Sequence, residues 1–122
     1  MKKSLALARV AAAVAVAAGL ISEAAAHHGW ADFDRGRTVE VSGVVTESRY
    51  ANPHCEVRLQ TEEGEWFVEL SAVPRMRRRG LTAEMIKPGT RLTLVGHPHK
   101  KKEREMKAIR MVREGREYDL NL

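Results

Sequence analysis

Apolar and polar residues alternate with a period of two along most of the chain after residue 37, which is the pattern of half-buried β-strands. Gly43 interrupts the first of these stretches and predicts a bulge or a bend there. The last residues alternate only weakly and predict at most a short edge strand. The predicted strands cover residues 38–48, 54–61, 65–72, 90–96 and 105–112.

The alternation stops between the third and fourth predicted strands. Thr82 can cap a short helix that ends at Ile86, because Glu84 lies in its first turn and Lys-Pro-Gly follows. Three strands, one helix and two strands is the element order of the OB-fold, a five-stranded Greek-key barrel. We therefore predict an all-β, OB-like five-stranded barrel over residues 27–122. The alternative is a small antiparallel sandwich, which buries the same alternating faces.

The same alternation assigns side chains to the two faces of the barrel. Cys55 falls on the inner face, so we expect a small core residue and not a ligand or nucleophile. Met106 and Met111 are five residues apart, which predicts opposite faces of the last strand and ordinary packing. His54 and Glu69 fall on the outer face.

The start of the chain has the organisation of a signal peptide. A positively charged beginning precedes an apolar stretch at residues 10–21, and three alanines end at Ala26. The apolar stretch is shorter than the roughly 20 residues that span a bilayer. We expect residues 1–26 to be cleaved and the product, beginning at His27, to be periplasmic or secreted. Cleavage one or two residues earlier and an uncleaved anchor are the alternatives.

The charge and the cysteine content describe the domain that would remain after cleavage. Removal of the signal would leave 96 residues with a formal charge of +3, because the signal holds three of the 21 Lys and Arg and one of the 16 Asp and Glu. A single cysteine excludes an internal disulfide, so the core must hold the domain together.

Basic residues gather in two places, one in the helical connection and one between the last two predicted strands. In a cytoplasmic OB-fold they would indicate nucleic-acid binding. Export and the lack of stacked aromatic residues argue against that partner, and we expect no membrane span. These two groups of basic residues form either a solvated face or a binding site for an anionic envelope ligand or a partner protein. The residues concerned are Arg77, Arg78, Arg79, Lys100, Lys101 and Lys102.

Five motifs follow one another in the order HHGW-x-x-FD, RYANPH, EWFVEL, RRRGLT and IKPG. With them the chain resembles a family of small exported bacterial proteins of unknown function. Mature N-termini in that family read His-His-(Ser/Gly)-aromatic, and an aromatic-x-Asn-Pro-His motif follows the first strand. This chain departs from the family at Cys55, where an aliphatic or aromatic residue is common. The resemblance implies an exported β-barrel-like domain and no particular activity.

Two histidines follow the expected cleavage site. The new α-amine and the imidazole of His27 can chelate a metal, and a third nitrogen would complete a T-shaped site that favours Cu(II). This resembles the histidine brace of copper monooxygenases and of some periplasmic copper carriers. His54 is the candidate for the third nitrogen, and Glu69 could fix its tautomer.

Cleavage one residue earlier would instead place His28 third, which completes a square-planar site for Cu(II) or Ni(II). The simpler alternatives are a solvated His-His start, a turn-capping role for His54 and an ordinary polar face around Glu69. His97 and His99 lie among lysines, and we expect them to face solvent.

No sequence motif indicates catalysis. There is no HExxH motif, no phosphate-binding loop and no pairing of a nucleophile with a base. We therefore predict a small exported binding domain and not an enzyme. Copper binding, an anionic envelope ligand or protein partner, and a purely structural subunit are the three hypotheses that the sequence leaves open.

Overall fold

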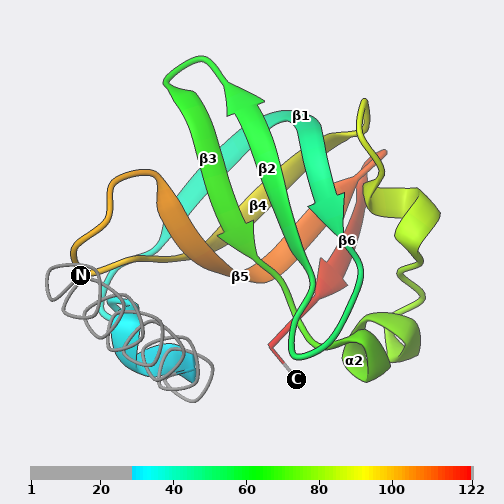
Figure 1. Ribbon diagram of the computed structural model, residues 1–122, viewed down its shortest axis with the longest axis horizontal. Coiled ribbons are helices and arrows are strands. Elements are labelled where there is room, and N and C mark those ends of the chain that lie inside the picture. Colours follow the sequence, from blue (N-terminus) through cyan, green and yellow to red (C-terminus); the bar gives the residue numbers. More distant parts are fainter. Residues whose placement is uncertain (1–28, 122) are drawn as a thin grey trace, which may run out of the picture.

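Six β-strands and three short helices make up residues 29–121, the part of the chain that the computed structural model describes (Figure 1). The predicted signal segment, the expected cleavage site, His27 and His28 lie outside these residues. In chain order the elements are a 3-10 helix Gly29–Asp32, β1 Val39–Arg49, β2 Glu56–Thr61, β3 Gly64–Glu69, α2 Val73–Arg78, a 3-10 helix Ala83–Ile86, β4 Arg91–Pro98, β5 Glu105–Arg113 and β6 Arg116–Asp119.

The strands form one sheet in the order β3-β2-β1-β4-β5-β6, and a further pairing of β3 with β5 closes it. This closing pair is parallel, with Phe67 opposite Glu105 and Val68 opposite Met106, whereas every other pair is antiparallel. The predicted OB-like five-stranded barrel is therefore confirmed, and the sandwich alternative is wrong. β6 adds a sixth strand along the free edge of β5.

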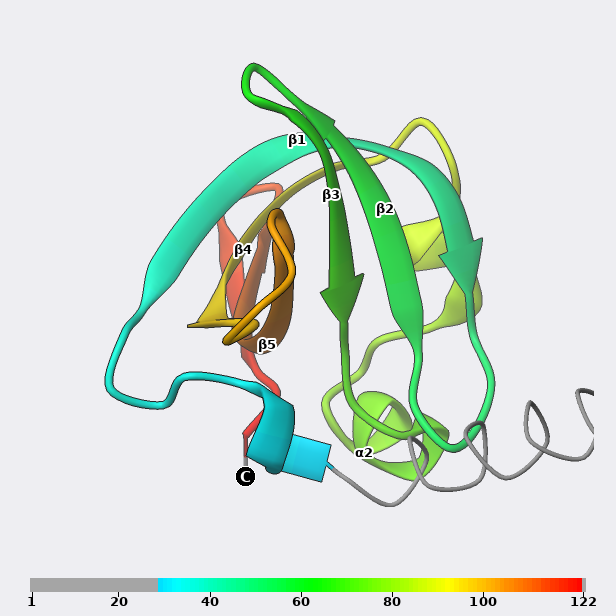
Figure 2. The same ribbon diagram turned by 60° about the vertical axis from the view of Figure 1, so that its left-hand side comes forward.

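Strand β1 bends sharply so that it can pair with β2 on one side and with β4 on the other (Figure 2). The register with β2 shifts between Val45 and Glu47, so the bulge lies just beyond Gly43. Gly43 allows a close approach of two backbones instead. A Cβ at this position would lie 2.3 Å from the carbonyl oxygen of Gln60.

A second bulge changes the inner face of β5. Its register with β4 shifts between Val95 and Gly96, which leaves one residue of β5 without a partner. Met106 and Met111 are consequently both fully buried. The expectation that they face opposite ways is wrong, because an unpaired residue between them reverses the alternation.

The helical connection also differs from the prediction. The α-helix is α2, which begins before the expected helix and has a proline, Pro74, in its first turn. Proline suits that position because its missing N–H would have no partner inside the helix. The segment Ala83–Ile86 is only a 3-10 turn, and the side chain of Thr82 makes no capping hydrogen bond.

The barrel interior is filled by aliphatic, methionine and aromatic side chains from all strands, together with Met76, Leu81 and Ile86 from the helical connection. Cys55 is fully buried, as predicted, and burial raises the pKa of its thiol. The polar outer face of β2 and β3 also agrees with the prediction. There the guanidinium of Arg58 lies over the ring of Phe67 and pairs with Glu65.

Candidate functional site

His54 belongs to the β1–β2 loop, whose backbone is held firmly against the segment between β3 and α2. Cys55 exchanges backbone hydrogen bonds with the segment after β3, donating to Ser71 and accepting from Leu70. The side-chain oxygen of Asn52 accepts a hydrogen bond from the N–H of Val73 at 3.1 Å. His54 itself lies just before β2 and is half-buried, with its ring on the outer face of the barrel.

His54 is the first member of a polar chain that crosses the seam between β3 and β5. Its Nε2 lies 2.8 Å from Oε1 of Glu69, and Lys107 Nζ donates to the other oxygen of that carboxylate at 2.6 Å. The Glu69 and Lys107 side chains are only 15% and 16% exposed, so solvent screens this pair weakly. The contact between Glu69 and His54, which the sequence offered beside the alternative of an ordinary polar face, is therefore present.

The second ring nitrogen of His54 has no hydrogen-bond partner although it is buried. The nearest carboxylate oxygen belongs to Glu56, at 3.9 Å, which is too long for a hydrogen bond. Histidines that bind metals commonly hold a carboxylate with the nitrogen that does not touch the metal, and His54 shares this one feature with them.

The N-terminal segment of the described chain packs beside this cluster. The centroid of the Trp30 ring lies 4.9 Å from Lys107 Nζ and 5.3 Å from the guanidinium carbon of Arg35. Phe33 is buried and forms a β-bridge with His99. Trp30 and Phe33 therefore fasten this segment to the barrel.

His97 and His99 do not face solvent freely, contrary to the prediction. His97 belongs to β4, and its Nδ1 lies 2.6 Å from the carbonyl oxygen of Arg37. Nδ1 of His99 accepts the backbone N–H groups of Lys101 and Lys102, both at 3.0 Å. Both rings also pack edge-on against aromatic residues of the N-terminal segment. Both histidines therefore help to hold the chain segments around them, and the Nδ1 lone pair of His99 is already engaged.

A cavity of about 330 Å³ lies between the N-terminal segment, the β1–β2 loop and α2, and we call it the His54 cavity. Trp30 and His54 both line this cavity, so the N-terminal segment of the described chain lies close to His54. Its lining is Trp30, Pro53, His54, Leu70, Ser71, Ala72, Pro74, Arg75, Arg78, Lys107, Ala108 and Leu120.

The two basic clusters do not form one surface. Arg77 and Arg78 are exposed on α2, whereas Lys100, Lys101 and Lys102 are exposed in the β4–β5 loop on the other side of the barrel (Figure 1). Arg79 is only half-exposed. Of these residues, only Arg78 lines the His54 cavity.

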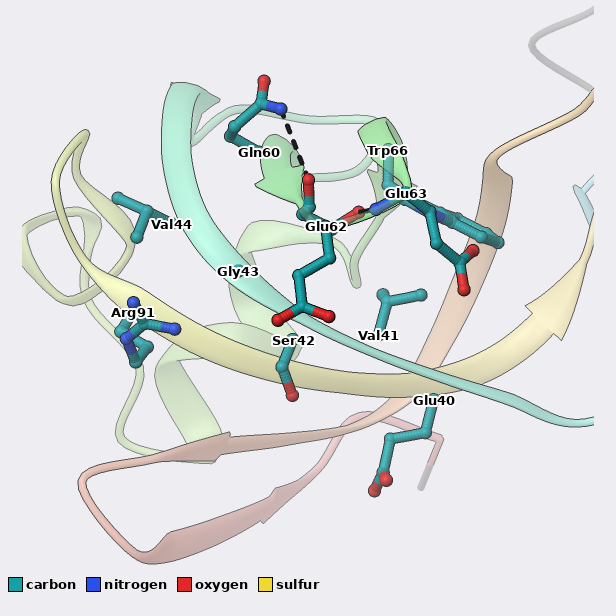
Figure 3. Close-up of a pocket in the computed structure, with 11 residues that line it drawn as sticks. Glu40, Val41, Ser42, Gly43, Val44, Gln60, Glu62, Glu63, Trp66 and Arg91 are labelled. Atoms are coloured by element: carbon teal, nitrogen blue, oxygen red, sulfur yellow. Dashed lines mark hydrogen bonds between the residues drawn. The ribbon is translucent and has the colours of Figure 1, made fainter.

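A larger depression of about 580 Å³ lies under the β2–β3 hairpin, at the opposite end of the barrel from His54 (Figures 1 and 3). Figure 3 shows Glu62 reaching from the hairpin across β1, with Arg91 to one side. None of the predicted site residues lines this larger depression. We place the candidate site at His54, because the ionic cluster and the unpartnered ring nitrogen are there.

Two features are absent from the described part of the chain. Within residues 29–121, no group of three or more His, Cys, Asp and Glu side chains is arranged to hold a metal ion. None of the helices in that range has the length and apolar character needed to cross a bilayer. His27 and His28, two of the predicted metal ligands, lie outside the range, so their part of the prediction stays a prediction.

The sequence did not identify Lys107 and Arg75 as members of this site. Lys107 reaches Glu69 only because β5 pairs with β3 in parallel, with Glu69 opposite Lys107. Arg75 belongs to a helix that the sequence placed further along the chain. The only sequence signal for Lys107 was its charge at an outer position of β5. Charged residues are common at such positions on any solvated strand, so this signal did not point to a site.

Solved structures resemble this chain in fold alone. The ZRD-deleted mutant of TiaS in complex with agmatine has 16% identity and a TM-score of 0.50, over 71% of this chain and 27% of that one. For the complex of TiaS with tRNA and ATP the identity is also 16%, the TM-score is 0.49, and the match covers 66% of this chain and 19% of the other. The yeast Stn1 and Ten1 structure matches with 11% identity and a TM-score of 0.45, over 62% and 42%.

The chain thus spans less than half the length of each of these matched chains. Among curated proteins none matches it. A family of unknown function does match, from residue 13 to residue 107, which is most of the sequence and includes the barrel up to the first residues of β5. The chain therefore belongs to this family of unknown function, DUF6152.

Proposed function

We propose that this protein is an exported copper-binding domain that holds Cu(II) between the mature N-terminus and His54. The α-amine and imidazole of His27 supply two nitrogens, and His54 supplies the third. Imidazole and amine nitrogens suit the tetragonal geometry of Cu(II). The observation that carries the proposal is the hydrogen bonding of the His54 ring. Its Nε2 contacts Glu69, and its Nδ1 is buried without a hydrogen-bond partner.

The position of the N-terminal segment supports the same site. Trp30, three residues after His27, lines the cavity that His54 also lines. Its aromatic and ionic contacts anchor the chain there, which lowers the entropy cost of bringing the terminus to a metal. Glu56 and Glu69 lie beside the ring and supply negative charge that offsets the nearby cations.

The test begins with the exported protein, whose intact mass defines its first residue. Cu(II) affinity is then measured by competition with a chelator for the wild type and for His54→Ala. We expect His54→Ala to weaken binding at least about a hundredfold, which is the upper end of the effect of losing only an outer-shell partner. The control is His99→Gln, which removes an imidazole already engaged by backbone N–H groups and should leave the affinity unchanged.

A second variant tests the amine. Three glycines inserted before His27 move the α-amine away and leave no histidine within the first three positions. Affinity should then fall to that of a free peptide containing two histidines. The proposal is wrong if protein that begins at His27 binds Cu(II) no more tightly than such a peptide. It is equally wrong if His54→Ala binds as tightly as the wild type.

A further inference from the structure

The His54 cavity is lined by three cationic side chains and by no carboxylate. Arg75 and Arg78 reach it from α2, and Lys107 reaches it from β5. Its volume of about 330 Å³ is at the lower end of the range of cavities that hold small molecules. Cations that converge on a small cavity favour a negatively charged occupant.

The three cations are not compensated equally. Lys107 is neutralised by Glu69 at 2.6 Å. Arg75 donates through Nη1 to the carbonyl oxygens of Leu120 and Asn121, at 3.5 and 3.3 Å. Neither Arg75 nor Arg78 forms an ion pair with any carboxylate of residues 29–121. Among the described residues, therefore, no carboxylate neutralises either of these two guanidinium groups at the cavity.

Guanidinium groups have a specific preference among anions. Their planar fork of N–H donors matches the two oxygens of a carboxylate or of a phosphate. The hydrogen bonds that Arg75 makes to the last residues of the described chain fix its side chain in advance. Less conformational entropy is then lost when it binds an anion.

Besides the three cations, the polar side chains of His54 and Ser71, and Ala72, the lining contains six apolar residues. Leu70, Ala108 and Leu120 are all nearly fully buried, and they form part of the wall. Trp30 contributes an aromatic ring, and Pro53 and Pro74 add further carbon surface. Trp30, Pro53 and Pro74 are not buried, so a bare inorganic anion would leave their carbon surface uncovered, whereas a molecule with a hydrocarbon body would bury it.

We propose that the His54 cavity binds a small organic carboxylate, with its charged end on Arg75 and Arg78 and its apolar body against Trp30, Pro53 and Pro74. This proposal does not depend on copper, because none of these contacts uses a metal. It also differs from an anion site spread over both basic clusters, since the β4–β5 loop contributes nothing to it.

The experiment uses the exported protein after removal of metal with a chelator, and benzoate is the probe. Calorimetric titration measures binding, and the indole N–H signals of the two tryptophans locate it in a ¹H–¹⁵N NMR spectrum. We expect benzoate to bind and to shift the signal of Trp30, which is assigned with Trp30→Phe. Benzamide lacks the charge and phosphate lacks the apolar body, so each should bind at least about tenfold more weakly.

Two neighbouring arginines provide a matched pair of variants. Arg78→Gln should weaken benzoate binding about tenfold, because a hydrogen bond to a charged group is worth about 1.5–3 kcal/mol. Arg77→Gln removes the same charge from an exposed residue of α2 that does not line the cavity, and it should have little effect. Both residues are exposed, so both variants should fold.

Four results would overturn the proposal. They are no binding of millimolar benzoate, equal binding of benzamide, equal binding of phosphate, and an equal loss in Arg77→Gln and Arg78→Gln. Because the protein is metal-free in this experiment, none of these results bears on the copper site. Conversely, failure of the copper titration leaves the benzoate result intact.

Discussion

Replacing Gly96 with alanine should destabilise the barrel at the seam between β4 and β5. A Cβ at residue 96 would lie 2.1 Å from the carbonyl oxygen of Lys107 and 2.7 Å from the Cα of Ala108. Both contacts are with backbone atoms, so no side chain can turn away to relieve them. The strands would have to separate by about 1 Å to restore an ordinary van der Waals contact.

The size of the effect follows from two costs. Forcing an extra methyl group into a packed site costs about 1–3 kcal/mol, and a ladder hydrogen bond stretched by the separation contributes about 1 kcal/mol more. We therefore expect a loss of about 3 kcal/mol in the free energy of unfolding. For a domain of this size that corresponds to a fall in Tm of about 12–24 °C.

Thermal and urea denaturation followed by circular dichroism would measure the loss. The matched control is Gly36→Ala in an exposed turn, where the new Cβ would meet only a side-chain oxygen of Asp34, at 3.3 Å. That substitution should change stability by no more than about 0.5 kcal/mol. If Gly96→Ala is as stable as the control, the close approach of β4 and β5 at this bulge is not what requires glycine.

Two further predictions concern buried ionisable groups. Glu69→Gln should cost about 1–2 kcal/mol in urea denaturation, because its bonds to Lys107 and His54 are largely shielded from solvent but not fully buried; a variant as stable as the wild type would contradict this. Cys55 should react with a thiol reagent only when the protein unfolds. Since burial raises the pKa of its thiol, stability should fall as the pH rises above about 8.5, where the unfolded chain loses that proton first.

The fold was predictable because alternation in the sequence records which side of each strand is buried. Cys55 and the apolar residues that follow it on β2 are buried as expected. The errors occur where the period of two breaks. The bulge in β5 buries both Met106 and Met111, and no residue type in that strand marks the unpaired position. The α-helix was misplaced because Thr82 resembles a helix cap, whereas Pro74 marks the true beginning.

The site was predictable only in part, because its members are brought together by long-range pairing. The contact of His54 with Glu69 followed from two adjacent antiparallel strands, and the structure contains it. Lys107 joins them through the parallel pairing of β3 with β5, which leaves no local signal in the sequence. His97 was misjudged because its hydrogen-bond partner, Arg37, is 60 residues away in the sequence. His99 was misjudged although its partners, Lys101 and Lys102, follow it closely, because no residue pattern marks that turn.

The way the barrel closes has a consequence for how quickly the chain can fold. β1, β2 and β3 follow one another as hairpins, and so do β4, β5 and β6, so each half can form from neighbouring residues. The two seams that join the halves pair Val39 with Gly96 and Phe67 with Glu105. These pairings must first overcome the entropy of closing long loops. Assembly of the halves, and not formation of the hairpins, should therefore limit the folding rate.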